Sequence, residues 1–288
     1  MSGVKENAKS KEASKVSQLA NLVKEKYSRD RLDRGKIPQE TDQHFYRRYL
    51  ISKKWDVNKA FKQIVHMLEW REKEKVDEMM QLSADDVLGG PVGIEEKILQ
   101  SFPMFGIPRT NDLPDASASD SNTLPSAKDS LVNGVIRDSK GRLVFCYKVG
   151  KMIVDELVEY TDEEKFHRYT IWRFEHMVKL LGETLESKTG ADKWVLLFDL
   201  EGFSMSKHAK RSVVNVIKGF NGLGASCYRE TVAQIYIINA PKVFSLGYSM
   251  IHPFLNSRTR KKIIMSNGKG DDVSEYLDIS KRLPCVEN

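Results

Sequence analysis

The sequence predicts an α/β protein in which an N-terminal helical module precedes a β-sheet with covering helices. From Gln39 to Met80 the chain has no glycine or proline, and its apolar residues recur every three or four positions. This spacing is typical of amphipathic helices. After Gly134, short apolar runs alternate with longer amphipathic stretches. Strands that alternate with helices favour a sheet with parallel pairs.

Three segments organise the first half of the chain. Residues 1–16 are mostly Lys, Ser, Glu and Ala, and a segment with so little to bury is predicted to be a disordered tail. The helical module spans residues 17–90 and closes at Gly89-Gly90-Pro91, a strong turn signal. The second domain spans residues 91–288. Within it, residues 108–133 hold three prolines among Ser, Asp, Ala and Asn, so we expect a mobile surface loop there.

The second domain is predicted to alternate strands with helices. The runs at 194–198 and 235–238 are continuously apolar, which is typical of strands that are covered on both faces. The predicted elements are, in order, a strand over 143–149, a helix over 162–187, a strand over 194–198, a helix over about 207–220, a turn at Gly222-Leu223-Gly224, a strand over 234–239, a helix from Pro241 and a strand over 263–265.

Several classes of protein are excluded by composition. The longest uncharged apolar runs are about five residues long, whereas a membrane-spanning helix needs roughly 20. The first residues are polar and charged, so no signal peptide is expected. The three cysteines are an odd number without a Cys-x-x-Cys pair, which argues against a disulfide framework or a zinc ribbon. We therefore expect a reduced, cytoplasmic protein.

Catalytic signatures are absent as well. The chain has no Gly-x-Ser-x-Gly, His-Glu-x-x-His or phosphate-loop motif, and its six histidines lack metal-ligand spacing. Asp199 and Glu201 end a predicted strand, but no base or nucleophile accompanies them in the sequence. A turn-forming role is the favoured interpretation of both. The sequence thus predicts no enzyme, no metal and no cofactor.

Positive charge is unevenly distributed. Residues 1–75 hold 19 Lys and Arg against 11 Asp and Glu, within a formal net charge of +6 for the whole chain. A second basic cluster comprises Arg258, Arg260, Lys261 and Lys262. Such patches attract nucleic acids and anionic membranes alike, and a solvated surface is the ordinary alternative. Because the chain has no recognisable nucleic-acid module, we expect no nucleic-acid partner.

Four ordered blocks of sequence resemble the CRAL-TRIO lipid-binding family, in particular its phosphatidylinositol-transfer and α-tocopherol-transfer group. The blocks cover residues 194–202, 235–244, 253–255 and 259–263. Weaker likeness extends the match to roughly residues 40–284. The resemblance implies a mixed β-sheet that forms the floor of a deep apolar pocket for one lipid, a mobile helix that gates the pocket, and no chemical step.

The predicted pocket and gate follow from this resemblance. After Pro241, apolar residues form a stripe at helical spacing. Gly247 would loosen that helix by about 1 kcal/mol relative to alanine. An ordinary core helix is the alternative. The predicted pocket and gate residues are Tyr147, Trp172, Phe198, Phe203, Phe220, Phe244, Leu246, Met250, Ile251 and Phe254.

The predicted headgroup contacts are Arg48, Lys218 and His252. The resemblance implies a lysine before the Pro-Phe-Leu block and a glutamate on the helix after the 194–198 strand. Here His252 stands at the first position and Gly219, beside Lys218, near the second. His252 can still donate a hydrogen bond to phosphate. The predicted ligand is a glycerophospholipid, phosphatidylinositol first and phosphatidylcholine second, with sterol-like and isoprenoid ligands left open.

The expected function is lipid transfer by a soluble protein that associates peripherally with anionic membranes through the basic cluster at 258–262. The alternative is a lipid-sensing adaptor that binds lipid but acts through a protein partner. In that case the loop at 108–133 and the basic N-terminus would dock the partner. Whether a lipid kinase uses the presented lipid is left open.

Overall fold

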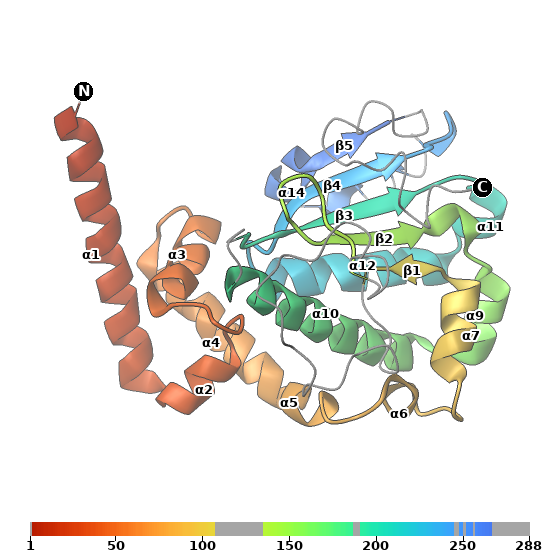
Figure 1. Cartoon of the computed structure of the whole chain (residues 1–288), viewed down its shortest axis with the longest axis horizontal. Helices are drawn as coiled ribbons and strands as arrows, with labels where there is room; N and C mark the ends of the chain where they lie inside the picture. The colour runs from red at the N-terminus through yellow and green to blue at the C-terminus, as the bar shows by residue number, and fades with distance from the viewer. Residues whose placement is uncertain are drawn as a thin grey trace, which may run out of the picture.

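A computed structural model describes residues 2–106, 135–186, 191–244, 248–249, 252–255 and 257–266 (Figure 1). The predicted loop at 108–133 lies outside these ranges, as do the predicted gate residues Leu246, Met250 and Ile251. Within the described residues, a series of helices leads into a five-stranded mixed sheet with covering helices. This arrangement confirms the predicted fold class.

The first 101 residues are helical almost throughout. In the range 2–106, the helices are α1 (Ser2–Lys26), α2 (Arg29–Arg34), α3 (Asp42–Ser52), α4 (Val57–Lys73), α5 (Val76–Met79), α6 (Ala84–Leu88) and α7 (Ile94–Ser101). The side chains of Ser28, Thr41, Asp56 and Ser83 accept backbone hydrogen bonds in the first turns of α2, α3, α4 and α6. These caps satisfy N–H groups that a helix start leaves unpaired.

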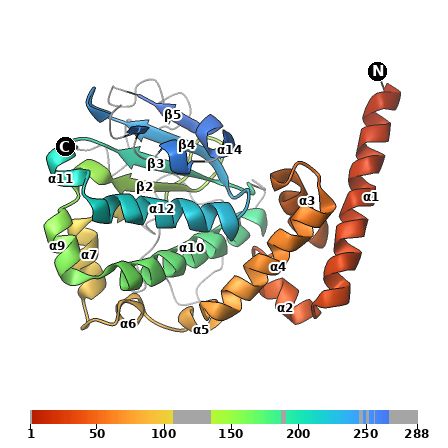
Figure 2. The same cartoon turned by 180° about the vertical axis from the view of Figure 1, so that it is seen from behind.

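Residues 2–16 are the first turns of α1 rather than a disordered tail. Between Val4 and Arg34 the chain has no glycine or proline, and its Lys, Glu and Ala residues are good helix formers. Leu19 and Val23, in the second half of α1, are fully buried where α1 packs on α3 and α4. The docked half therefore extends into a helix that stands at the edge of the molecule (Figures 1 and 2).

The five strands of the described sheet lie in sequence order. They are β1 (Met104–Phe105), β2 (Val144–Lys148), β3 (Trp194–Asp199), β4 (Val232–Ile238) and β5 (Ile263–Met265). β1 pairs antiparallel with β2, whereas β2 to β5 are parallel. Because parallel crossovers are right-handed and the order never reverses, successive crossover helices fall on one face. Figures 1 and 2 show α10 (Glu163–Glu186) and α12 (Arg211–Ser226) together beneath that face.

Successive strand residues point to opposite faces of this sheet. One face meets α10 and α12. The side chains on the other face form a separate buried cluster of Val144, Cys146, Val195, Leu197, Tyr236 and Ile238. Burial on both faces explains why β3 and β4 are continuously apolar, as the sequence predicts.

The predicted turn at Gly222-Leu223-Gly224 is wrong, because α12 continues through it to Ser226. Val213, Phe220 and Leu223 keep the helical spacing, and Leu223 is 4% exposed. An apolar face that continues to pack outweighs the roughly 1 kcal/mol that each glycine costs a helix. The remaining described elements are η2 (Val149–Lys151), α9 (Val154–Tyr160), α11 (Met205–His208), η3 (His252–Phe254) and α14 (Ser257–Lys261).

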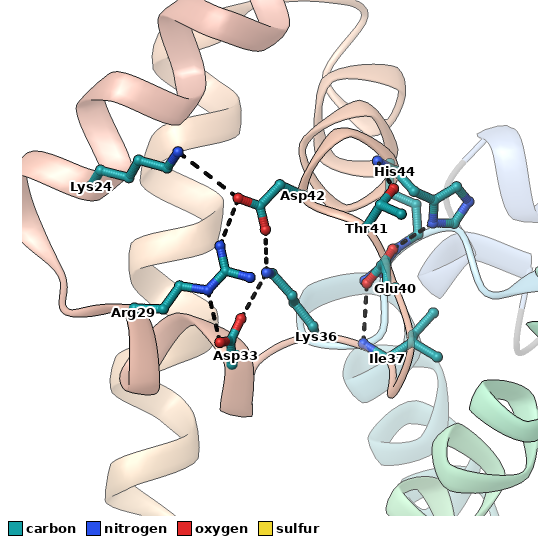
Figure 3. Close-up of polar contacts among 10 residues, drawn as sticks. Lys24, Arg29, Asp33, Lys36, Ile37, Glu40, Thr41, Asp42 and His44 are labelled. Atoms are coloured by element: carbon teal, nitrogen blue, oxygen red, sulfur yellow. Dashed lines mark hydrogen bonds and ion pairs between the residues drawn. The ribbon is translucent and has the colours of Figure 1, made fainter.

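Charged side chains hold the loop before α3 in place. Asp42 accepts hydrogen bonds from Arg29, at 2.8 Å, and from Lys36, and Lys24 approaches the same carboxylate (Figure 3). Nearby, Glu40 accepts from the backbone N–H of Ile37 at 3.1 Å. These contacts order the chain between α2 and α3.

The helical module also contacts the sheet domain directly. Gly182 of α10 faces Pro38, and a Cβ at Gly182 would lie 2.6 Å from the proline ring. Only glycine permits this approach. Arg71 of α4 donates to Glu175 of α10 at 2.7 Å. The hydroxyl of Tyr228 donates to the same carboxylate at 2.6 Å, so module and sheet domain share a buried polar contact.

None of the described helices is both long and apolar enough to span a bilayer. In the same part of the chain, no group of His, Cys, Asp and Glu side chains is placed to hold a metal ion.

Candidate functional site

A cavity of about 290 Å³ lies between the helix-covered face of the sheet and the helices α9, α10 and α12. Its walls are mainly apolar and aromatic. The sheet contributes Tyr147, Leu196, Phe198, Ile235 and Ile237, and the helices contribute Val154, Leu157, Phe166, Tyr169, Phe174, Met177, Val213, Ile217 and Phe220. A space lined in this way suits a ligand with extensive hydrocarbon surface.

The two ends of the cavity differ in polarity. Arg229 and Glu230 precede β4, Lys262 precedes β5, and Arg258 lies on α14; all four line the end where the parallel strands begin. Glu230 pairs with Arg258 at 3.1 Å and with Lys262 at 3.7 Å. Three cations thus face one carboxylate there. The end where the strands finish is lined by mostly apolar residues, including Met152, Phe203 and Phe244.

Aromatic rings fill the middle of the cavity wall. Tyr147 stacks on Phe198, with ring centroids 5.2 Å apart, and meets Phe220 edge-on at 5.7 Å. Burial raises the pKa of Tyr147 to about 12, so its hydroxyl remains a hydrogen-bond donor at neutral pH. No hydrogen bond joins this hydroxyl to another described residue.

Arg173 is the one buried cation on the helical wall, among the described residues that line the cavity. It lies midway along α10 and is 7% exposed. Its Nη1 donates to the hydroxyl of Tyr169 at 3.1 Å, and that hydroxyl donates to Oε1 of Glu95 at 2.8 Å. The Nε of Arg173 is buried without a partner. Among the described residues, no carboxylate forms an ion pair with this guanidinium.

Comparison with known proteins identifies the fold. The CRAL/TRIO domain family matches residues 133–283, which is more than half of the chain. The chain belongs to the CRAL/TRIO domain family. This confirms the resemblance found in the sequence.

Relatives of this CRAL/TRIO chain extend beyond it. A CRAL-TRIO domain-containing protein of Caenorhabditis elegans is 26% identical over 262 residues, which are 90% of this chain and 30% of that protein. The SEC14 cytosolic factor of Kluyveromyces lactis is 26% identical over 150 residues, 51% of this chain and 48% of that one. The phosphatidylinositol/phosphatidylcholine transfer protein SFH7 of Arabidopsis thaliana is 23% identical over 247 residues, which are 85% of this chain and 39% of that protein. The chain thus spans about a third to a half of these relatives.

A solved structure has the same fold. The crystal structure of Sfh5 superimposes with a TM-score of 0.54 at 18% identity, covering 88% of this chain and 70% of that one. At this identity the likeness concerns the fold alone.

The structure of this CRAL/TRIO domain brings part of the predicted pocket together. Five predicted residues line the cavity: Tyr147, Phe198, Phe203, Phe220 and Phe244. Trp172 does not. It precedes Arg173, about 100° around the helix, and its Nε1 donates to the carbonyl of Leu82 at 3.2 Å. The side chain of Phe254 lies outside the described part of the structure, as do the three gate residues named above.

The three predicted headgroup residues lie on three different elements, Arg48 on α3, Lys218 on α12 and His252 on η3. Arg48 is 5% exposed and forms an ion pair with Glu40 at 2.7 Å. Lys218 is exposed on α12. His252 is half-buried in η3, 3.1 Å from Arg260. None of the three is among the residues that line the cavity.

The predicted basic cluster divides into two pairs. Arg258 and Lys262 turn toward the cavity end and share Glu230, and burial lowers the pKa of Lys262. Arg260 and Lys261 are exposed on α14. A salt bridge to Glu230 accounts for the first pair, so only the second is available to a flat anionic surface.

Most of the residues that line the cavity were not predicted from the sequence, and two of them are arginines. Arg173 and Arg229 both line the cavity. A signal for Arg173 was present, because it lies four residues after Tyr169 and four before Met177, on the apolar face of its helix. A cation at such a position is unusual. No comparable signal marks Arg229, which lies in a turn before β4.

The carboxylate of Asp199 has a structural role. It accepts from the backbone N–H of Glu201 at 2.9 Å and from the side-chain amide of Asn239 at 2.8 Å. These contacts shape the turn after β3, in agreement with the turn-forming interpretation.

Proposed function

We propose that this CRAL/TRIO chain binds one lipid molecule in the cavity and transfers it between membranes. The ligand we propose is a glycerophospholipid, phosphatidylinositol first and phosphatidylcholine second. Two observations support this: the apolar and aromatic lining of the cavity, and the similarity to a protein named as a phosphatidylinositol/phosphatidylcholine transfer protein. The lining carries the proposal, because apolar walls shield acyl chains from water during transit.

Transfer requires no chemical step, so the protein acts as a binding protein and not as an enzyme. It works from the cytoplasm and meets membranes peripherally. The exposed residues Arg260 and Lys261 supply attraction to an anionic leaflet, where each basic residue contributes about 1 kcal/mol. The segment after Pro241, part of which lines the cavity through Phe244 and Tyr248, is the proposed gate.

A matched pair of glycines on α12 offers a direct test. Gly224 lines the cavity and Gly222 is exposed two residues earlier, and a Cβ at either position would meet no atom within 4 Å. Gly224→Phe should fill the cavity with an aromatic ring. Gly222→Phe should leave it open, with a similar gain in helix propensity.

The measurement is native mass spectrometry after incubation with phosphatidylinositol or phosphatidylcholine vesicles, followed by transfer of labelled lipid from donor to acceptor vesicles. We expect wild type and Gly222→Phe to form a 1:1 lipid complex. Gly224→Phe should lose most of it, because the added ring occupies space that the lipid needs. Equal loading of the two variants would contradict binding in this cavity. Stoichiometric binding without transfer would favour the lipid-sensing adaptor instead.

A further inference from the structure

We propose that Arg173 binds the anionic group of the lipid, so that a phosphate or carboxylate lies inside the cavity, halfway along it, rather than at its basic end. The proposal rests on the proposed function and deepens it by naming the residue and the chemical class of group that it recognises.

The two buried arginines of the described structure differ in their partners. Among the described residues, Arg48 and Arg173 are the two that are buried. Arg48 donates through Nε and Nη2 to the two oxygens of Glu40, each at 2.7 Å, and through Nη1 to the carbonyl of Arg229. Arg173 makes a single hydrogen bond, to the neutral hydroxyl of Tyr169. Arginine stays charged in proteins. Arg173, unlike Arg48, therefore carries a buried positive charge that forms no ion pair with a described carboxylate.

The position of Arg173 makes it accessible to a ligand in the cavity. Arg173 does not merely lie in the core: it lines the cavity, as do Tyr169 and Tyr147. The nearby carboxylate of Glu95 forms no ion pair with the guanidinium and is joined to it by hydrogen bonds through the hydroxyl of Tyr169. The Nε donor is buried without a partner. A buried cation with unused donors on a cavity wall is a place for an anion that the ligand itself brings.

The guanidinium of Arg173 is chemically complementary to an anionic lipid group. A guanidinium presents a planar fork that matches the paired oxygens of a phosphate or a carboxylate. Tyr147 lines the same cavity from the sheet side. Its hydroxyl is kept protonated by burial and has no hydrogen bond to a described residue. It can add one neutral donor to the same anionic oxygens. Phe198 and Phe220 flank Tyr147 and provide apolar surface for the adjoining hydrocarbon.

Two pairs of lipids isolate the anionic group as the variable. Dioleoylphosphatidic acid and dioleoylglycerol share their acyl chains and differ by a phosphate. Oleic acid and oleyl alcohol share one chain and differ by a carboxylate. Each pair is delivered as an equimolar mixture from cyclodextrin to the full chain, and native mass spectrometry measures the ratio of the two complexes. The first pair reports a phosphate source and the second a free carboxylate.

We expect wild type to prefer the anionic member of at least one pair by tenfold or more, and Arg173→Met to reduce that preference by at least tenfold. Arg168→Met is the matched control, because Arg168 is exposed on the same helix, and it should keep the wild-type ratio. Tyr147→Phe removes a single donor and should reduce the preference about threefold. It remains informative if Arg173→Met does not fold.

The outcomes separate this proposal from the proposed function. If wild type loads neutral and anionic lipids equally, or if folded Arg173→Met keeps the full preference, lipid binding stands and the role of Arg173 is overturned. If wild type loads none of the four lipids, lipid binding itself fails, and the role of Arg173 with it. If Arg173→Met does not fold, a wild-type preference for the anionic lipid that Tyr147→Phe leaves unchanged would overturn the proposal.

Discussion

Arg48 and Arg173 show two ways in which one protein buries the same side chain. Arg48 pairs with Glu40 inside the helical module and donates to the carbonyl of Arg229 in the sheet domain, so we call Arg48 and Glu40 the interface pair. At the interface, Glu40 is fully buried and both of its oxygens receive hydrogen bonds from Arg48. In the cavity, Arg173 has a phenol for a partner. A buried charge whose counter-charge belongs to the chain supports the fold, whereas a buried charge without one is available to a ligand.

The same substitution at the two arginines should separate these roles most strongly. Arg48→Met leaves the carboxylate of Glu40 buried without its cation, and removal of one partner of a buried pair costs about 3–5 kcal/mol. Arg173→Met leaves no carboxylate unpaired, so we expect the free energy of unfolding of the lipid-free protein to stay within about 1 kcal/mol of wild type. Denaturant unfolding monitored by circular dichroism measures both values.

Arg47→Met provides the control, because Arg47 is adjacent in sequence but half exposed, and its pairing with Glu12 spans 3.4 Å. It should change the free energy of unfolding by less than about 1 kcal/mol. A loss of equal size in Arg48→Met and Arg173→Met would show that both cations serve the fold and would remove the contrast.

The interface pair also predicts a dependence on pH. His44 lies between Asp192, 3.1 Å from its Nε2, and Glu40, 2.6 Å from its Nδ1. These contacts raise the pKa of His44 from 6.5 to about 9. Because the folded pKa is the higher one, the stabilisation is fully present below pH 6.5 and is lost as the pH rises to about 9. Its size is on the order of 2–3 kcal/mol after allowance for solvent screening.

Unfolding measured at pH 6 and pH 9 tests this, with His44→Gln as the comparison. We expect wild type to lose stability between the two pH values and His44→Gln to lose much less. The acidic partners contribute nothing in this window, because the pKa of Glu40 and that of Asp192 are both held at about 2. For Glu40, burial alone would raise the pKa, and the charge of Arg48 and the bond from His44 outweigh it. Equal pH dependence in the variant would place its origin elsewhere.

The smallest effect is expected at the protein surface, where cations with and without a salt bridge to Glu230 can be compared. Arg260 and Lys261 are exposed, whereas Arg258 and Lys262 are paired with Glu230. Replacing both exposed residues with neutral Gln should weaken binding to vesicles that contain phosphatidylserine by about 2 kcal/mol, roughly thirtyfold. The thermal stability should stay unchanged. Co-sedimentation at low and high salt measures the binding.

Lys62 and Lys179 offer the matched control, since both are exposed on helices away from α14. If replacing these two lysines with Gln weakens vesicle binding as much as replacing Arg260 and Lys261, net charge and not a local patch governs the attraction.

The strands could be predicted from the sequence because their signal is local. At 194–198 and 235–238 a continuous apolar run ends at a polar turn residue, and both runs lie within β3 and β4. The extent of α12 could not be predicted in the same way, since glycine is a weak helix breaker. Whether Gly222 ends a helix depends on where Leu223 finds a partner, and that partner lies in another part of the chain.

The roles of single charges were harder to predict for the same reason. Arg48 has the position expected of a headgroup contact, but its partner Glu40 lies eight residues away and faces it only after α3 has folded. In the sequence, Arg173 resembles any charged residue of an amphipathic helix. Only the folded structure shows that it lines a cavity. Sequence establishes which cations exist, whereas the three-dimensional structure decides which of them have counter-charges.

The order of the strands has a further consequence for the kind of ligand. Many α/β sheets wind in both directions from a central strand, and the crevice at that reversal, outside the carboxyl ends of the strands, holds soluble ligands such as nucleotides. In the part of the chain that the structure describes, the sheet winds in one direction only, with no such switch point among its strands. Its ligand space lies under the face of the sheet instead, where aliphatic and aromatic side chains are exposed to it. A strand order without a solvent-filled crevice, above an apolar cavity, favours an apolar ligand over a soluble one.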